Sequence, residues 1–170
     1  MIFFTANDGE ELLGRRKKIY EGAIPSGNSV ATLNLLRLGR IIANSNFEKK
    51  AAEIGRVFGV NVEQAPSEHT FLMVGVYFKI GPSYEVIIAG NSSAKDTEEM
   101  LKTIWKEFIS NKVVILRPTE NESPVIVNLA KFTQFMKMIN GKATAYICLN
   151  YACKITTTDT RKMLDLLNVK

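Results

Sequence analysis

A polar turn at residues 21–29 holds the side chains of this sequence that are best suited to chemistry. It places one carboxylate, two hydroxyls and one amide on a backbone bent by glycines and a proline. Such a loop can hydrogen-bond a polyol or sugar-like ligand, and its carboxylate is available for proton transfer. The same groups could instead cap the helix that follows, and residue types alone leave both explanations open. The candidate residues of the turn are Glu21, Pro25, Ser26, Asn28 and Ser29.

Charged residues before the turn extend this candidate site. A sugar isomerase or glycoside hydrolase needs two positioned carboxylates around a pocket, and Asp8, Glu11 and Glu21 could supply them. Arg16 and Lys18 belong to a short basic cluster that could contact a ligand or an anionic surface. A solvated helix end explains the same cluster more simply, and no aromatic residues alternate with it as in single-strand nucleic-acid binders. We therefore do not expect nucleic acid as a partner.

The only histidine of the sequence, His69, lies near the start of a predicted helix. There an imidazole could act as a base or bind a ligand. No cysteine lies close to it, and no HExxH pattern surrounds it, so a pocket-lining or helix-surface role is the simpler explanation. We keep His69 as a candidate ligand contact and predict no metal site.

The loop at residues 90–93 is a second candidate site, this time for an anion. It follows a predicted strand and precedes a predicted helix, which is where α/β folds bind anions through free backbone N–H groups. The loop lacks both the GxxxxGK[ST] and the GxGxxG patterns, so a plain strand-to-helix connection is the simpler explanation. We expect no cofactor.

The two cysteines, Cys148 and Cys153, cannot crosslink a chain of 170 residues as a secreted disulfide scaffold would. Their C-x4-C spacing is neither a zinc ribbon nor a CxxC redox site. We expect reduced thiols in the core, since a disulfide would require a turn at residues 150–151. With 46% apolar residues, a net charge of +5 and no apolar run of about 20 residues, the sequence predicts a globular cytoplasmic protein.

The residues before Pro82 predict helices. A short helix is expected between Thr5 and Tyr20, because acidic residues precede basic ones there. Apolar spacing predicts a broad-faced helix over residues 30–43, an antiparallel partner over 47–58, and a third helix that opens at Pro66 and runs through Tyr77. These helices would position the polar turn.

The residues after Pro82 predict a small sheet. Two apolar strands, 84–90 and 112–117, flank a helix that carries Met100, Ile104, Trp105 and Phe108, which predicts a βαβ unit with parallel strands. A helix around residues 129–139, a strand at 144–149 and a helix at 159–167 would complete the subdomain. The predicted fold is mixed α/β: helical hairpins in 1–82 and a small parallel sheet in 83–170, with one shared core.

Six segments of the sequence together follow a recognisable pattern. They are Phe4-Thr5-x-x-Asp8-x-Glu10-x-Leu12 with Arg16-x-Lys18, then Gly22-Ala23-x-Pro25-Ser26-Gly27-Asn28-Ser29, and finally Leu35-Leu36-Arg37-Leu38, Val113-Val114 and Ala143-Thr144-Ala145-Tyr146-x-Cys148 with Cys153. The pattern resembles proteins that join a thioredoxin-like domain to a helical barrel of the N-acylglucosamine 2-epimerase or six-hairpin glycosidase type.

That resemblance implies that the chain corresponds to the last third of the family's architecture, without its thioredoxin-like domain and most of its barrel helices. The family has aspartate where this chain has Glu21, and one extra methylene moves a carboxylate by about an ångström. We therefore expect a truncated or split relative with a vestigial or partner-completed carbohydrate-like site. If it is active, the resemblance implies an epimerase-like, isomerase-like or glycosidase-like reaction.

The missing helices would leave apolar flanks on residues 30–58 and 71–78. Such flanks predict a homo-oligomer, or docking onto a separate chain that carries the missing domain and barrel helices. No membrane contact is expected. The alternative function is a small anion- or nucleotide-binding α/β module without catalysis, which would use the loop at residues 90–93.

Overall fold

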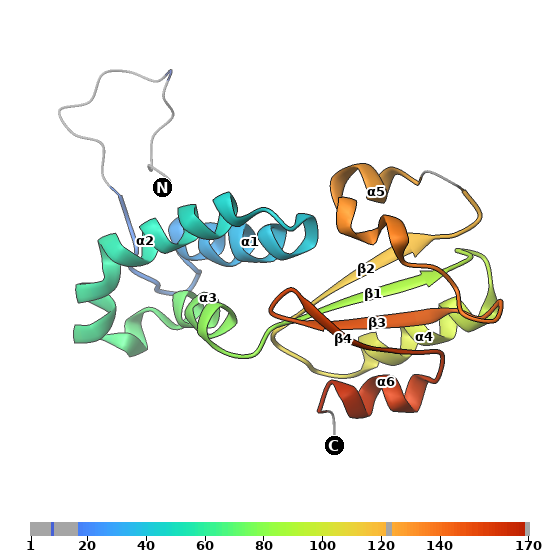
Figure 1. Ribbon diagram of the computed structural model, residues 1–170. Coiled ribbons are helices and arrows are strands. Elements are labelled where there is room, and N and C mark those ends of the chain that lie inside the picture. The colour runs from blue at the N-terminus through green and yellow to red at the C-terminus, as the bar shows by residue number, and fades with distance from the viewer. Residues whose placement is uncertain (1–7, 9–16, 122–123, 169–170) are drawn as a thin grey trace. The chain divides into compact units, whose positions relative to one another are not determined.

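The computed structural model describes residues 8, 17–121 and 124–168 of the chain and divides it into two compact units (Figure 1). The first unit comprises residues 1–39 and 44–81, and the second comprises residues 40–43 and 82–170. The predicted mixed α/β class is confirmed, since helices dominate the first unit and a four-stranded sheet organises the second. None of the described helices has the length and apolar character needed to cross a membrane.

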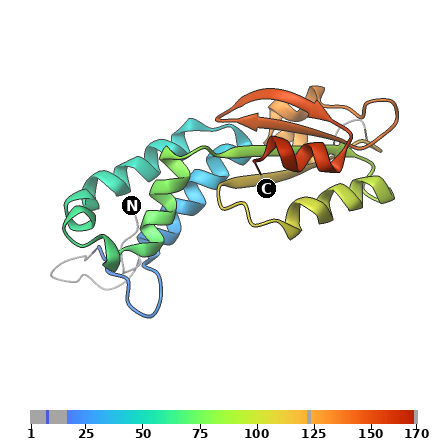
Figure 2. The same cartoon turned by 90° about the horizontal axis from the view of Figure 1, so that it is seen from below.

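The helices of the first unit are α1 (Gly27–Ile42), α2 (Ser45–Gln64) and α3 (Thr70–Ile80), with a single 3-10 turn, η1 (Pro66–Glu68), before α3. Figures 1 and 2 both show α1, α2 and α3 side by side. The three predicted helices are confirmed, although α2 runs six residues past its predicted end. The short helix predicted between Thr5 and Tyr20 lies mostly outside the described residues, and residues 17–20 are not helical.

Local sequence explains how α2 begins and what it buries. The Asn44 side chain accepts the N–H of Asn46 at 3.0 Å and so caps the helix. Ala51, Ile54 and Phe58 then recur at helical spacing on the buried face. They pack in a core that the first unit completes with Ile19 and Leu72.

The sheet of the second unit has the order β2-β1-β3-β4. Its strands are β1 (Tyr84–Gly90), β2 (Lys112–Pro118), β3 (Thr144–Leu149) and β4 (Ala152–Thr157). The first two run parallel and are connected through α4 (Lys95–Lys106), but β3 runs antiparallel to β1, and β4 antiparallel to β3. The predicted parallel pairing of the first two strands is present, but the sheet as a whole is mixed rather than parallel. Strand β4 was not predicted from the sequence, and a two-residue turn joins it to β3 as a hairpin.

Helices cover both faces of this sheet. Figure 1 shows α4 and α6 (Thr160–Leu166) on one face and α5 (Val125–Leu129) on the other. The strand β1 is buried along its whole length, so alternate residues serve two cores. Val86 and Ile88 pack with Met100 on one side, while Ile87 and Ala89 pack with Met136 on the other.

Two helix predictions in the second unit are wrong. The single helix expected around residues 129–139 is instead α5 followed by a 3-10 helix, η2 (Lys131–Phe135), because Ala130 leaves the helical region with φ −116° and ψ 71°. The predicted apolar face of α4 is also too wide. Met100 and Ile104 are buried, but Trp105 is 64% exposed and Phe108, beyond the helix end, is 94% exposed.

Candidate functional site

The carboxylate of the polar turn, Glu21, caps a helix that begins about fifty residues later in the chain. Its two oxygens accept the N–H groups of Phe71 at 2.6 Å and Leu72 at 3.0 Å. These N–H groups belong to the first turn of α3, where no acceptor exists within the helix. His69, the residue before α3, makes no side-chain cap. Glu21 therefore supplies both the missing acceptors and a negative charge at the positive end of the helix.

Two further hydrogen bonds tie the same segment to the start of α3. The Glu21 N–H donates to the carbonyl oxygen of Glu68 at 3.3 Å. The buried imidazole of His69 lies with Nδ1 at 3.2 Å from the carbonyl oxygen of Ile19. Because a carbonyl oxygen only accepts, Nδ1 is the protonated nitrogen in this contact. His69 thus holds the approach to the turn in place.

The second half of the turn caps α1. Ser26 Oγ accepts the N–H of Ser29 at 3.1 Å, and the two hydroxyls hydrogen-bond each other at 2.7 Å. Asn28 Nδ2 donates to the carbonyl oxygen of Lys18 at 2.9 Å. All three side chains are buried. The bonds between Ser26 and Ser29 correspond to the helix-capping explanation of the turn, whereas the Asn28 amide ties the start of α1 to the segment before the turn.

An open hollow of about 300 Å³ lies where the turn meets α3. Of the predicted site residues, only Glu21 and Pro25 line it. Its full lining is Glu21, Gly22, Ala23, Ile24, Pro25, Thr70, Phe71 and Val74. The hollow therefore combines one carboxylate, one hydroxyl and an aromatic side chain on a single wall.

The remaining predicted site residues do not join this hollow. Asp8 and Lys18 are exposed and do not line it, and Ser26, Asn28, Ser29 and His69 are buried. Glu11 and Arg16 lie outside the described residues. Among the residues that line the hollow, Glu21 is the one carboxylate, so the pair that glycoside hydrolysis requires is not assembled there.

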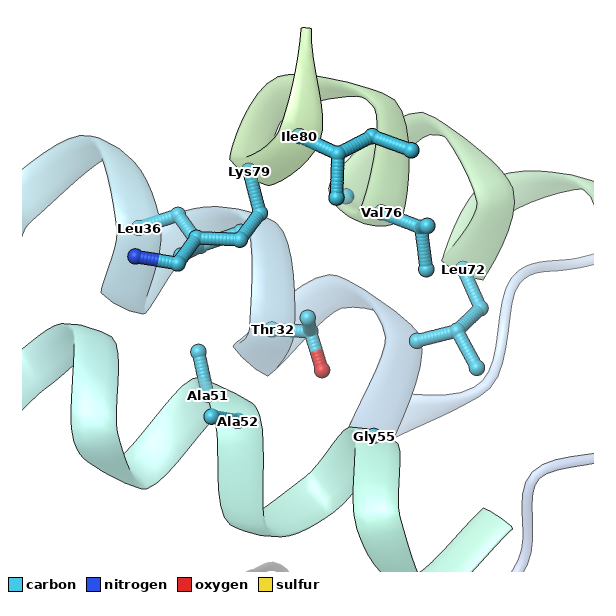
Figure 3. Close-up of a pocket in the computed structure, with 10 residues that line it drawn as sticks. Thr32, Leu36, Ala51, Ala52, Gly55, Leu72, Val76, Lys79 and Ile80 are labelled. Atoms are coloured by element: carbon cyan, nitrogen blue, oxygen red, sulfur yellow. The ribbon is translucent and has the colours of Figure 1, made fainter. Parts of the chain in front are cut away.

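A second hollow of about 120 Å³ lies between α1, α2 and α3 (Figure 3). Leu36 from α1, Ala51 from α2 and Leu72 from α3 give it an apolar lining. Its one hydroxyl, that of Thr32, donates to the carbonyl oxygen of Asn28 at 2.8 Å. Gly75 lets α3 approach α1 closely, because a Cβ there would lie 3.1 Å from Thr32 Cγ2. The hollow suits an apolar group of a few carbon atoms.

Two backbone N–H groups of the loop at residues 90–93 already have acceptors within the chain. The Ser92 N–H donates to the Glu120 carboxylate at 3.2 Å, and the Ser93 N–H donates to Asn91 Oδ1 at 2.9 Å. A hydrogen bond from the Ser92 side chain, together with backbone N–H groups that include those of Ser92 and Thr119, lowers the pKa of the Glu120 carboxyl. A carboxylate of the chain itself thus takes the place of an external anion, and the geometry gives the anion-binding alternative no support.

The two cysteines are joined by a disulfide, so the expectation of reduced core thiols is wrong. Asn150 and Tyr151 form the tight turn that such a bond requires, with φ values of 50° and 68°. The turn pairs β3 with β4 so that Cys148 faces Cys153 across the hairpin. The disulfide was not predicted because the strand that carries Cys153, β4, was not predicted.

A buried ion pair that was not predicted from the sequence contacts this hairpin turn. Arg40 Nη1 lies 3.0 Å from Glu85 Oε1, and Glu85 Oε2 accepts the Tyr151 N–H at 3.0 Å. The Arg40 guanidinium lies 4.3 Å from the centroid of the Tyr151 ring. Asn150 Oδ1 accepts from Ser83 Oγ at 3.2 Å. The hairpin tip is thus held by polar contacts on both sides of the turn.

Burial raises the pKa of the Glu85 carboxyl above its ordinary value of 4.5, although the Tyr151 N–H and Arg40 both lower it. The signal for this pair was present in the sequence. Glu85 is a lone charge inside an apolar strand, and a carboxylate in that position needs a partner. Among the described residues no three metal-ligating side chains come together.

The chain is similar to spermatogenesis-associated protein 20 of several mammals. It is 29% identical to the Homo sapiens protein over 154 residues and 29% identical to the Rattus norvegicus protein over 160 residues, which cover 91% and 94% of this chain. It spans about a fifth of the length of these curated relatives. No protein-family model and no solved structure matches the chain. These similarities support a relationship between the chain and one part of the spermatogenesis-associated protein 20 type of protein.

Proposed function

We propose that the chain supplies one wall of a carbohydrate-like binding site, which a partner chain or a longer protein of the same type completes. The observation that carries the proposal is the open hollow formed by residues 21–25 and the first turn of α3. Its volume of about 300 Å³ stands at the lower limit for small-molecule sites, and its open side leaves room for a second wall. In this account α1, α2 and α3 form part of an α/α barrel.

The lining of the hollow suits the two surfaces of a sugar. The C–H face of a sugar ring packs on apolar and aromatic side chains, which Phe71 and Val74 supply. Its hydroxyl groups need acceptors and donors. Each oxygen of Glu21 accepts one N–H and retains lone-pair capacity for a ligand hydroxyl, and Thr70 adds an exposed hydroxyl.

Binding rather than hydrolysis is the function that this wall supports by itself. Glu21 is held by two N–H donors, so it is well positioned to accept hydrogen bonds from a ligand. Catalysis of the glycosidase type requires a second carboxylate on the other side of the sugar. In our proposal that group would come from the completing chain.

The exposed apolar residues of the helices favour such a partner. Val57, Val60, Tyr77 and Ile80 are all more than half exposed, and an apolar hollow opens beside Ile80. We propose that helices of a partner, either a second copy or a chain that carries the remaining barrel helices, cover these residues. Light scattering of the purified chain should then show self-association, or a complex once the partner is added. A chain that stays monomeric and forms no complex with the added chain would contradict the proposed partner surface.

Amide chemical shifts measured during titration with a panel of hexoses and N-acylated amino sugars would test the binding site. Even half of a site should give binding near millimolar affinity, about 4 kcal/mol, which such spectra detect. We expect shifts at residues 21–25 and 70–74. Phe71→Leu should weaken them, since the substitution removes the aromatic face but keeps the backbone N–H that Glu21 accepts.

A matched control is Phe135→Leu, the same substitution at an exposed residue of the second unit that does not line the hollow. This variant should bind as the unaltered chain does. Absence of shifts across the whole panel, or shifts that Phe71→Leu leaves unchanged, would overturn the carbohydrate proposal.

A further inference from the structure

We propose that the Cys148–Cys153 disulfide is a reversible thiol–disulfide exchange site, which a low-molecular-weight thiol attacks at Cys153 and whose reduction releases the tip of the β3–β4 hairpin. The proposal concerns the second unit and is independent of the carbohydrate site. It rests on the unequal exposure of the two cysteines, the short loop between them, and the contacts of the residues that they enclose.

The two cysteines differ in their access to solvent. Cys148, on the inner strand β3, is 2% exposed and packs with Ile87 and Ile115. Cys153, on the edge strand β4, is exposed. An incoming thiolate therefore has access to the sulfur of Cys153, while Cys148 is the natural leaving group and resolving thiol.

The disulfide adds little constraint that the hairpin lacks. The cysteines are only five residues apart, and a short loop restricts the unfolded chain less than a long one does. Strand pairing already joins β3 to β4 at Ala145 with Thr157 and at Ile147 with Ile155. The crosslink can therefore open without separating β3 from β4, while it still restrains the turn residues that it encloses.

The exchange follows the usual two steps, with a monothiol of the glutathione class as the reductant. Its thiolate attacks Cys153 Sγ, the Cys148–Cys153 bond breaks, and Cys148 leaves as a thiolate that takes up a proton. A second thiolate then attacks the mixed disulfide at the sulfur of the first reductant molecule. The products are two protein thiols and one oxidised disulfide of the reductant, so two electrons have passed to the protein.

The residues enclosed by the disulfide link it to the buried ion pair. Asn150 and Tyr151 both have positive φ, a conformation that non-glycine residues keep only when their surroundings impose it. The Tyr151 N–H donates to Glu85, and its ring stacks on Arg40. The disulfide is one of the restraints on this turn. When it opens, the contacts of Tyr151 with Glu85 and Arg40 should break more often.

The test uses the full chain incubated with glutathione, quenched with an alkylating reagent and read by mass spectrometry. We expect the disulfide to open in the folded chain and to re-form with oxidised glutathione. In single variants treated with oxidised glutathione, Cys153 of Cys148→Ser should form the mixed disulfide, with release of one glutathione thiolate, at least about tenfold faster than Cys148 of Cys153→Ser. Circular dichroism of both variants verifies that they are folded.

Amide hydrogen exchange supplies the second measurement. Reduction should speed exchange of the Tyr151 N–H by about tenfold or more and leave the central strand residue Ile87 unchanged. Three results would overturn the proposal: a disulfide that opens only in denaturant, two cysteines that react at equal rates, or a Tyr151 N–H that is indifferent to reduction.

Discussion

Two glutamates, one in each unit, perform similar tasks in opposite surroundings. Glu21 reaches from the polar turn to the N–H groups of Phe71 and Leu72, and Glu85 reaches from β1 to the N–H of Tyr151. Each carboxylate fixes a backbone segment that lies distant in sequence. Glu21 does so at the rim of an open hollow, whereas Glu85 does so in the interior beside Arg40.

The difference shows what each position allows. Glu21 is half-buried and accepts hydrogen bonds from the N-terminal end of α3. Its carboxylate can therefore also face a ligand. Glu85 is desolvated, and its interactions are confined to the protein. The polar-turn motif indicated Glu21 as a candidate residue, whereas Glu85 stands out only as a charged residue within a buried strand.

The largest effect should come from breaking the buried pair. Arg40→Met leaves Glu85 buried without its cation, and removal of one partner of a buried ion pair costs about 3–5 kcal/mol. We expect the free energy of unfolding in urea to fall by that amount. The double variant Arg40→Met with Glu85→Gln should recover most of the loss, because the amide oxygen still accepts the Tyr151 N–H. A loss below about 1 kcal/mol in the single variant would contradict the assigned pair.

The same pair should give a pH dependence. Burial raises the pKa of Glu85 above 4.5 in the folded chain, so the folded state binds more protons than the unfolded state between the two pKa values. The contribution of Glu85 to stability is therefore complete below its unfolded pKa and declines as the pH rises through its folded pKa. Relative to Glu85→Gln, the unaltered chain should lose stability over that range. A difference independent of pH would refute this sign.

Removal of the half-buried carboxylate of Glu21 should have a smaller effect. Glu21→Ala deletes both acceptors at the start of α3, and loss of a helix cap costs about 1–2 kcal/mol. Urea unfolding measures the loss. Glu21→Asp, which installs the residue of the resembled family, should keep part of the cap with a shorter reach. If Glu21→Ala were as stable as the unaltered chain, the assigned role of Glu21 as the cap of α3 would be wrong.

The smallest effect is expected for the ion pair of a third glutamate. Glu48 pairs with Lys79, whose side chain is 44% exposed. Exposed ion pairs contribute less than about 1 kcal/mol, so Lys79→Met should change thermal stability little. A loss as large as that of Glu21→Ala would show that exposure of the paired charge does not set the ranking of these carboxylates.

Much of the fold could be predicted because its signals are local. The apolar run at residues 84–90 has the bounds of β1, and Ala51, Ile54 and Phe58 gave the buried face of α2. The hairpin could not be predicted in the same way. Its turn uses Asn150 and Tyr151 at positive φ, and an aromatic residue gives no turn signal there.

The candidate site was only partly predictable for a similar reason. Sequence spacing identified the polar turn, but the partner of Glu21 lies about fifty residues away, and no local pattern indicates which helix a carboxylate will cap. Spacing also could not separate the residues that line the hollow, Glu21 and Pro25, from the buried caps Ser26, Asn28 and Ser29. That separation follows from tertiary packing.

Hydrogen exchange at the Phe71 and Leu72 amides tests most directly the claim that Glu21 organises the polar turn and the hollow. First-turn N–H groups have no acceptor in their own helix, so their protection must come from Glu21. In Glu21→Ala we expect both amides to exchange about tenfold faster or more, while Ile87 in the second unit keeps its rate. Equal rates at Phe71 and Leu72 in the two proteins would contradict the account.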